Sequence, residues 1–198
     1  YDDGGGWSLA TIDDYGWRSA VVTDGANRPH VSYYSWPSDL ELRYAYHDGS
    51  SWNIDSVEVV GLSVTMMAQG DTSLALDAQG TPHIAYQQVD SEDLKHAYWN
   101  GTTWSIETVD SQGNVGEDVS LALDVNGDPV IAYRDGSNNE AKVAWWTGSG
   151  WLFHDPDDAG STGGFNISLA MTGSGLAHLA FLQLAGSDLR HVWQAPCP

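Results

Sequence analysis

The chain has 198 residues, with 27 acidic side chains against 7 lysines and arginines and a formal net charge of -20. This charge repels phosphate backbones and anionic membranes, and no apolar run approaches the roughly 20 residues that span a bilayer, so we expect neither a nucleic-acid partner nor membrane insertion. One cysteine, Cys197, excludes a disulfide framework within the chain, and we expect a secreted or extracellular protein whose signal peptide has been removed.

A hairpin-like sequence occurs four times along the chain. The copies are AVVTDGANRPHVSY (20–33), SLALDAQGTPHIAY (73–86), SLALDVNGDPVIAY (120–133) and SLAMTGSGLAHLAF (168–181). Their starting positions 20, 73, 120 and 168 are separated by 53, 47 and 48 residues. A period of this size is typical of a four-stranded propeller blade. Apolar and small residues alternate in each copy, which predicts two strands around a turn.

The turn of each hairpin has a residue that tolerates positive φ at one fixed place. These residues are Asn27, Gly80, Gly127 and Gly175. Because asparagine and glycine reach the left-handed region at low cost, the pattern predicts a tight turn there in all four copies.

A third and a fourth strand follow each hairpin. The third strands read LRYAY, LKHAY, AKVAW and LRHVW, with one cation in each: Arg43, Lys95, Lys142 and Arg190. We expect these cations to form structural ion pairs with the acids that end the first strands, Asp24, Asp77 and Asp124, with an anion-binding site as the alternative. The fourth strands begin at Trp52, Trp104 and Trp151, which we expect to anchor neighbouring blades.

The fourth copy has no fourth strand of its own. The N-terminal segment GGGWSLATID (4–13) matches GTTWSIETVD (101–110), so Trp7 corresponds to Trp104. A strand supplied from the other end of the chain would remove the open sheet edges. We therefore predict an all-β, closed four-bladed β-propeller in which the N-terminal strand completes the last blade, as one domain over residues 1–194 with a C-terminal tail at 195–198.

The repeat S-L-A-L-D-x-x-G-x-P-H-I-A-Y, followed by L-K-x-A and G-x-x-W, resembles the repeats of secreted bacterial β-propellers. The number of blades is shared with hemopexin-like domains, and the G-x-x-W turns look like those of some lectins and of sialidase-type repeats. The resemblance covers nearly the whole chain and implies the architecture more strongly than an activity, since propellers have many unrelated functions.

Three histidines recur at one position of the second strand: His30, His83 and His178. Around a central channel they could bind a transition-metal ion, and the alternative is a hydrogen-bonded packing role. The segment DVNGD (124–128) is similar to a calcium loop, and its alternative is a hairpin turn. A calcium or transition-metal cofactor in the channel is thus a hypothesis.

Loops that differ between copies are better candidates for a ligand site than the repeated scaffold. On the expected loop face they contribute aromatic and planar polar groups, Trp36, Gln87, Gln88, Arg134 and Asp135. This chemistry suits sugars and peptides. We predict a non-enzymatic, lectin-like module for a carbohydrate or glycoprotein. The alternatives are a metal-dependent enzyme that uses the histidines, or a structural domain of a larger secreted protein.

Overall fold

The computed structural model describes residues 6–36, 39–61, 71–156, 163–184 and 186–194. Within these residues every regular element is a β-strand, and no helix has the length and apolar character needed to cross a membrane. The strands are β1 (Gly16–Thr23), β2 (Pro29–Ser35), β3 (Leu40–His47), β4 (Trp52–Gly61), β5 (Thr72–Leu76), β6 (Pro82–Gln88), β7 (Asp93–Trp99), β8 (Trp104–Asp110), β9 (Val115–Leu123), β10 (Pro129–Asp135), β11 (Glu140–Trp146), β12 (Trp151–His154), β13 (Phe165–Met171), β14 (Ala177–Gln183) and β15 (Asp188–Trp193).

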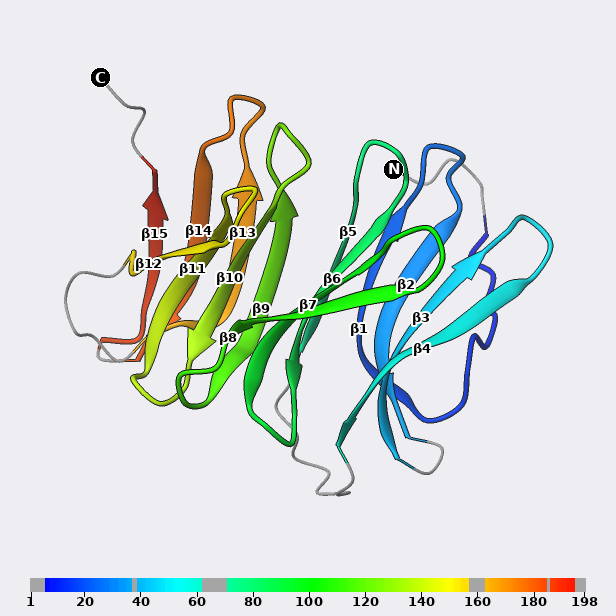
Figure 1. The fold of residues 1–198 in the computed structure, drawn as a ribbon, viewed down its shortest axis with the longest axis horizontal. Helices are drawn as coiled ribbons and strands as arrows, with labels where there is room; N and C mark the ends of the chain where they lie inside the picture. The colour runs from blue at the N-terminus through cyan, green and yellow to red at the C-terminus, as the bar shows by residue number, and fades with distance from the viewer. Residues whose placement is uncertain (1–5, 37–38, 62–70, 157–162, 185, 195–198) are drawn as a thin grey trace.

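The strands form four antiparallel sheets that follow the chain. The first three sheets have the orders β1-β2-β3-β4, β5-β6-β7-β8 and β9-β10-β11-β12, and the last has β13-β14-β15. Each sheet corresponds to one sequence repeat. Figure 1 shows the sheets side by side in a row, from the first sheet at one end to the last at the other. The all-β class and the blade-like repeat predicted from the sequence are therefore confirmed.

The hairpin turns have the backbone conformation that their sequences predict. Asn27 has φ 59°, and the glycines at the same place, Gly80, Gly127 and Gly175, have φ between 81° and 86°. The acid before each of the first three turns accepts backbone hydrogen bonds: Asp77 Oδ1 accepts from the amides of Gln79 and Thr81, both at 2.8 Å. Asp24, Asp77 and Asp124 thus cap turns.

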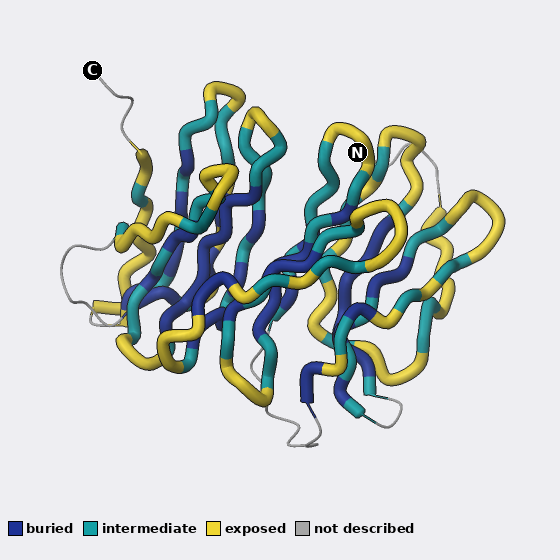
Figure 2. Tube along the Cα trace, in the orientation of Figure 1, coloured by how far each residue is buried: buried dark blue, intermediate teal, exposed yellow. Residues whose placement is uncertain are grey.

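Apolar cores lie between successive sheets. Between the first two, Leu42 and Tyr44 pack against Ile84 and Tyr86. Trp104 contacts Tyr44 across this boundary with ring centroids 5.1 Å apart, so it anchors two sheets as expected. Similar cores join the second sheet to the third and the third to the fourth. Figure 2 shows the burial concentrated in these inner strands, whereas β15 and the turns are exposed.

A buried acid at the end of a fourth strand also joins neighbouring sheets. Asp110, the last residue of β8, accepts hydrogen bonds from Tyr133 (2.6 Å) and Lys142 (2.9 Å) of the third sheet. Burial alone would raise the pKa of Asp110, but these hydrogen bonds outweigh it and lower the pKa below its usual value. Structural ion pairs on the repeated cations are thus confirmed at this boundary.

The same arrangement occurs at two other cations. Glu58 accepts from Tyr86 (2.6 Å) and Lys95 (2.5 Å). Asp13 accepts from Tyr33 (2.8 Å) and Arg43 (2.7 Å). The acids predicted as partners, those that end the first strands, were wrong, because their carboxylates are occupied by turn amides. Arg190 has no ion pair within the described residues.

The predicted N-terminal strand of the last sheet is not formed. Residues 6–15 contain no strand, and the last sheet has three strands in the part of the chain that the structure describes. Trp7, predicted to anchor two blades, is fully exposed. The physical reason is separation, since Asp13 is bound to the first sheet while β15 lies at the far end of the row. Gly4, Gly5 and the predicted tail at 195–198 lie outside the described residues.

Candidate functional site

The side chains predicted to form a ligand site on the loops are largely engaged with the protein. Gln87 is buried, and its Nε2 donates to the Asn114 side chain (2.7 Å) and to the carbonyl of Val115 (3.0 Å). Gln88 accepts from the amide of Ser91 at 2.6 Å. Gln87 therefore links the second sheet to the start of β9, and Gln88 holds the loop between β6 and β7 of its own sheet.

Arg134 and Asp135 end β10 and are buried as well. Arg134 pairs with Glu117, donates to the Asn139 side chain at 2.6 Å and stacks over Phe165 at 4.1 Å. Asp135 accepts from the amide and side chain of Asn138 at 3.0 and 2.9 Å. Burial lowers the pKa of Arg134, and Asp135 opposes that effect.

Trp36 directly follows β2 and is partly exposed. It belongs to the first sheet, whereas Gln87 and Gln88 belong to the second and Arg134 and Asp135 to the third. The structure therefore places the five residues on three successive sheets and does not show them lining a common pocket. Their role in binding a ligand stays a prediction.

The three repeated histidines lie in different sheets, and each contacts a ring within its own sheet. His30 hydrogen-bonds Tyr44, His83 lies 3.1 Å from His96, and His178 lies 3.2 Å from His191. Within the described residues no group of three or more His, Cys, Asp or Glu side chains is placed to hold a metal ion. The structure does not bring the three histidines together, because each lies in a different sheet and contacts rings of that sheet.

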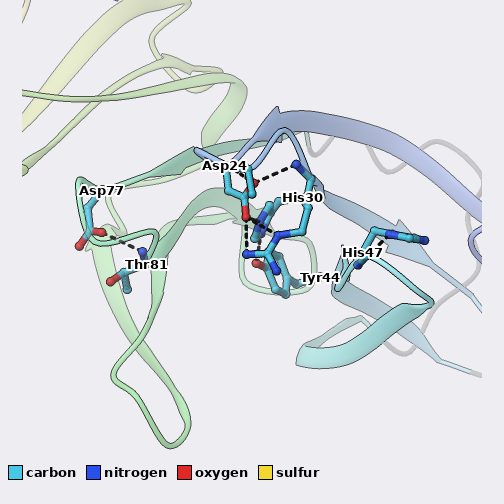
Figure 3. Close-up of polar contacts among 9 residues, drawn as sticks. Asp24, His30, Tyr44, His47, Asp77 and Thr81 are labelled. Carbon is cyan, nitrogen blue, oxygen red and sulfur yellow. Dashed lines mark hydrogen bonds and ion pairs between the residues drawn. The ribbon is translucent and has the colours of Figure 1, made fainter.

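The environment of His30 is polar on one side and aromatic on the other. Figure 3 shows it between Asp24 and Tyr44, and its Nε2 lies 3.7 Å from the Asp24 carboxylate. Burial lowers the pKa of His30 against the attraction of Asp24. Backbone and side-chain hydrogen bonds from Arg28 lower the pKa of Asp24 to about 2, so this carboxylate is charged at neutral pH.

A pocket opens beside His30, between the first and second sheets. Its volume is about 270 Å³, and it is lined by Arg28, His30, Tyr44, Tyr46, Asp55, Pro82, Trp99 and Trp104. We call this the aromatic pocket. Tyr46 stacks on Tyr44 with centroids 5.9 Å apart, and Trp99 meets Trp104 edge to face at 5.8 Å. Aromatic surfaces thus come from both sheets.

The aromatic pocket also contains polar groups. The side chain of Arg28 is about half exposed while its Nη2 is 2.7 Å from Asp24, so the guanidinium is held in place and has donors left over. Asp55 supplies a carboxylate from β4. The Nε1 of Trp104 is buried and has no hydrogen-bond partner in the described part of the chain. Such a donor is costly unless it acquires a partner.

A second pocket of about 280 Å³ lies between the third and fourth sheets. Val143, Trp145, His154, Ala177, Val192 and Trp193 are among the residues that line it. His154 stands three residues after Trp151, as Asp55 stands three residues after Trp52. The two pockets therefore occupy equivalent positions at two different sheet boundaries, and they differ in their polar groups.

Sequence reasoning missed the aromatic pocket because its residues lie on repeated strands, which we assigned to the scaffold. A signal was present in the differences between copies. The position of Arg28 is occupied by Thr81, Asp128 and Leu176 in the other hairpins. Because the chain has few cations, a cation that occurs in one turn and not in the equivalent turns indicates that this turn differs in function from the others.

Together, the repeated antiparallel sheets and the pockets between them define a protein of β-propeller-like class. No protein-family model matches the sequence, and no curated protein sequence matches it. Solved structures do match. The lectin of Aleuria aurantia in complex with α-methyl-L-fucoside has a TM-score of 0.59 at 16% identity, over 86% of this chain and 56% of the lectin.

Two further structures show the same fold. The BP39L lectin of Burkholderia pseudomallei has a TM-score of 0.58 at 13% identity, over 91% of this chain and 54% of that lectin. The NanB sialidase of Streptococcus pneumoniae has a TM-score of 0.57 at 14% identity, over 90% of this chain and 29% of the sialidase. This chain spans little more than half of the two lectins. At these identities the likeness establishes the fold alone.

Proposed function

We propose that the protein is a non-enzymatic carbohydrate-binding module and that the aromatic pocket is its principal binding site. The observation that carries the proposal is the composition of this pocket, in which tryptophan and tyrosine rings from two sheets surround Arg28 and Asp55. Sugars present apolar C–H faces and a rim of hydroxyls. Rings take the faces, and charged planar groups exchange hydrogen bonds with the hydroxyls.

The size and electrostatics of the aromatic pocket fit a small neutral sugar better than an anion. Its volume of about 270 Å³ lies near the lower end of ligand pockets. Arg28 already faces Asp24, and Asp55 adds a second carboxylate, so the local charge does not favour a carboxylate or phosphate ligand. A monosaccharide or the end of a glycan chain meets both conditions.

The solved structures support the carbohydrate class from an independent direction. The Aleuria aurantia lectin is seen with a fucoside, and the other named neighbours are a lectin and a sialidase. Proteins of this fold therefore include several that act on or bind sugars. We extend that class to this chain, with an extracellular location in keeping with its strongly acidic composition.

The loop that carries Trp36 is a second candidate site in the same proposal. Trp36 has no aromatic counterpart in the other repeats and keeps part of its surface accessible, which suits contact with a ligand. The partly exposed Trp36 lies on the first sheet, the sheet that also supplies Arg28 and Asp55 to the aromatic pocket.

A glycan array, followed by calorimetric titration with the sugars that it identifies and with α-methyl-L-fucoside, tests the proposal. We expect binding at micromolar to millimolar affinity that is weakened about 30-fold in Trp99→Ala. Trp146 has the position of Trp99 in the third sheet and does not line the aromatic pocket, so Trp146→Ala is the matched control. Absence of binding to every glycan on the array and to the fucoside at millimolar concentration would overturn the carbohydrate assignment.

A further inference from the structure

One face of the last sheet lacks the neighbour that the same face has in every other sheet. In the second sheet this face contains Ala85 and Leu94, both buried against the third sheet. The equivalent face of the last sheet contains two cross-strand pairs, His178 with Trp193 and Leu182 with Leu189. Leu189 is 80% exposed and Trp193 is 61% exposed. We call this surface the outer face.

The outer face keeps the groups that join sheets elsewhere. Ser73 accepts a hydrogen bond from the amide of Leu121 in the next sheet (2.9 Å), and Ser120 accepts one from Leu169 (3.0 Å). Ser168 has the same place in the last sheet and is exposed. The outer face therefore has the same features as the faces that contact a following sheet elsewhere in the chain.

The edge of the last sheet is incomplete as well. Strand β7 pairs with a fourth strand, β8, whereas β15 has no partner on its outer edge within the described residues. Strand β8 and residues 7–13 share the pattern W-S-[IL]-x-T-[VI]-D. Trp7 is 104% exposed and Leu9 is 100% exposed. The sequence of the missing strand is therefore present, its residues 7–11 are exposed, and it pairs with no strand in the described structure.

Asp13 fixes where this N-terminal segment belongs. It binds Tyr33 at 2.8 Å and Arg43 at 2.7 Å, as Asp110 binds Tyr133 and Lys142. Asp110 ends β8, the fourth strand of the second sheet, and its partners lie in the third sheet. Asp13 thus has the place of the last residue of a fourth strand in a sheet that would precede the first one.

We infer that the sheet preceding the first one is the last sheet of a second copy of this chain. Residues 7–13 of one copy pair with β15 of the second copy. The first sheet of the copy that supplies residues 7–13 then covers the outer face of the second copy. Asp13 is bound to the first sheet, and the chain's own last sheet lies at the opposite end of the row (Figure 1). A second copy can therefore reach Asp13 without any rearrangement of the four sheets.

Cysteine cross-linking tests the register of this contact. His96 pairs with Glu107 in the second sheet, so the same register places His191 of one copy opposite Ala10 of the other. In a Cys197→Ser background, Ala10→Cys chains are mixed with His191→Cys chains and oxidised. We expect a disulfide-linked heterodimer, because directly opposite residues have Cβ atoms about 5 Å apart. Leu9→Cys with His191→Cys is the matched control, because Leu9 points to the other side of the strand and should yield about tenfold less product.

Sedimentation velocity provides the second measurement. The wild type should self-associate with rising concentration, and Trp7→Ala should raise the dissociation constant by about 30-fold, whereas at concentrations where both proteins are monomeric their melting temperatures should be equal. A wild type that remains monomeric throughout would overturn the inference. So would a doubly substituted Ala10→Cys, His191→Cys chain that forms its disulfide within one monomer, since that result means closure by the chain itself. Neither result bears on sugar binding in the aromatic pocket.

Discussion

Lys142 on β11 donates to Asp110 on β8 over 2.9 Å, so that one ion pair joins the second sheet to the third. Only 4% of the Asp110 side chain is exposed, and 18% of that of Lys142. Tyr133 completes the carboxylate's hydrogen bonds at 2.6 Å. The pair therefore acts as part of a buried network that sets how two repeats pack, which distinguishes it from a surface ion pair.

Removal of the cation should destabilise the fold. Lys142→Met leaves the Asp110 carboxylate buried with Tyr133 as its remaining side-chain donor, and we expect a loss of about 2 kcal/mol in the free energy of unfolding. Arg190→Met is the control, because Arg190 has the same repeat position but is exposed, and it should change stability by less than about 0.5 kcal/mol. Urea denaturation measures both. Equal effects of the two substitutions would contradict the network.

The hairpin turns offer a second test. Gly127 has φ 86°, where a side chain is strained, so Gly127→Ala should cost about 1 kcal/mol. Gly173 lies in another turn without a positive φ, and a methyl group there meets no atom within 4 Å. Gly173→Ala should therefore leave the melting temperature nearly unchanged. Thermal unfolding of both variants checks this, and a stable Gly127→Ala protein would show that the turn can change its conformation cheaply.

A third prediction concerns pH. Burial, reinforced by His96, lowers the pKa of His83 from 6.5 to about 4. Above pH 6.5 the imidazole is neutral in both the folded and the unfolded chain. Between pH 6.5 and 4 the unfolded chain binds the proton and the folded chain does not, so stability falls as the pH is lowered, by up to about 3 kcal/mol.

His83→Gln removes this titration. Its free energy of unfolding should therefore fall less steeply than that of the wild type between pH 7 and pH 4.5, as urea titrations at several pH values would show. Parallel pH profiles for the two proteins would mean that His83 is protonated in the folded state at the same pH as in the unfolded chain.

The repeats made much of the fold predictable. Alternation and turn glycines such as Gly80 predict strands from local chemistry alone, and the fixed order of strands predicts one antiparallel sheet per repeat. The ion-pair partners of the repeated cations were harder to predict from the sequence. Asp24 and Asp13 are both acids near a strand end, and only the packing of sheets distinguishes a turn cap from an inter-sheet partner. Closure depends on the summed angles between sheets, which no short pattern encodes.

The position of the aromatic pocket was not predictable from the sequence. Differences between repeats led to the loop residues Trp36 and Arg134, and the structure shows that Arg134 is buried against Glu117. Burial cannot be judged from a residue's place in a loop. The aromatic pocket requires Tyr46 and Trp99 to meet across two sheets, and that contact depends on the tertiary arrangement.

The two candidate positions for the sugar give different expectations for three substitutions. If the aromatic pocket binds the sugar, Trp99→Ala should weaken binding by about 2 kcal/mol, or about 30-fold in the dissociation constant, because a ring face is lost. Asp55→Asn keeps the shape of the side chain and removes its charge, so it should weaken binding by about 1 kcal/mol. Trp36→Ala should then have little effect. Calorimetric titration of all three variants with the same sugar decides the matter: if only Trp36→Ala reduces the affinity, the site lies on the loop that follows β2, and the rings of the aromatic pocket serve to pack the first sheet against the second.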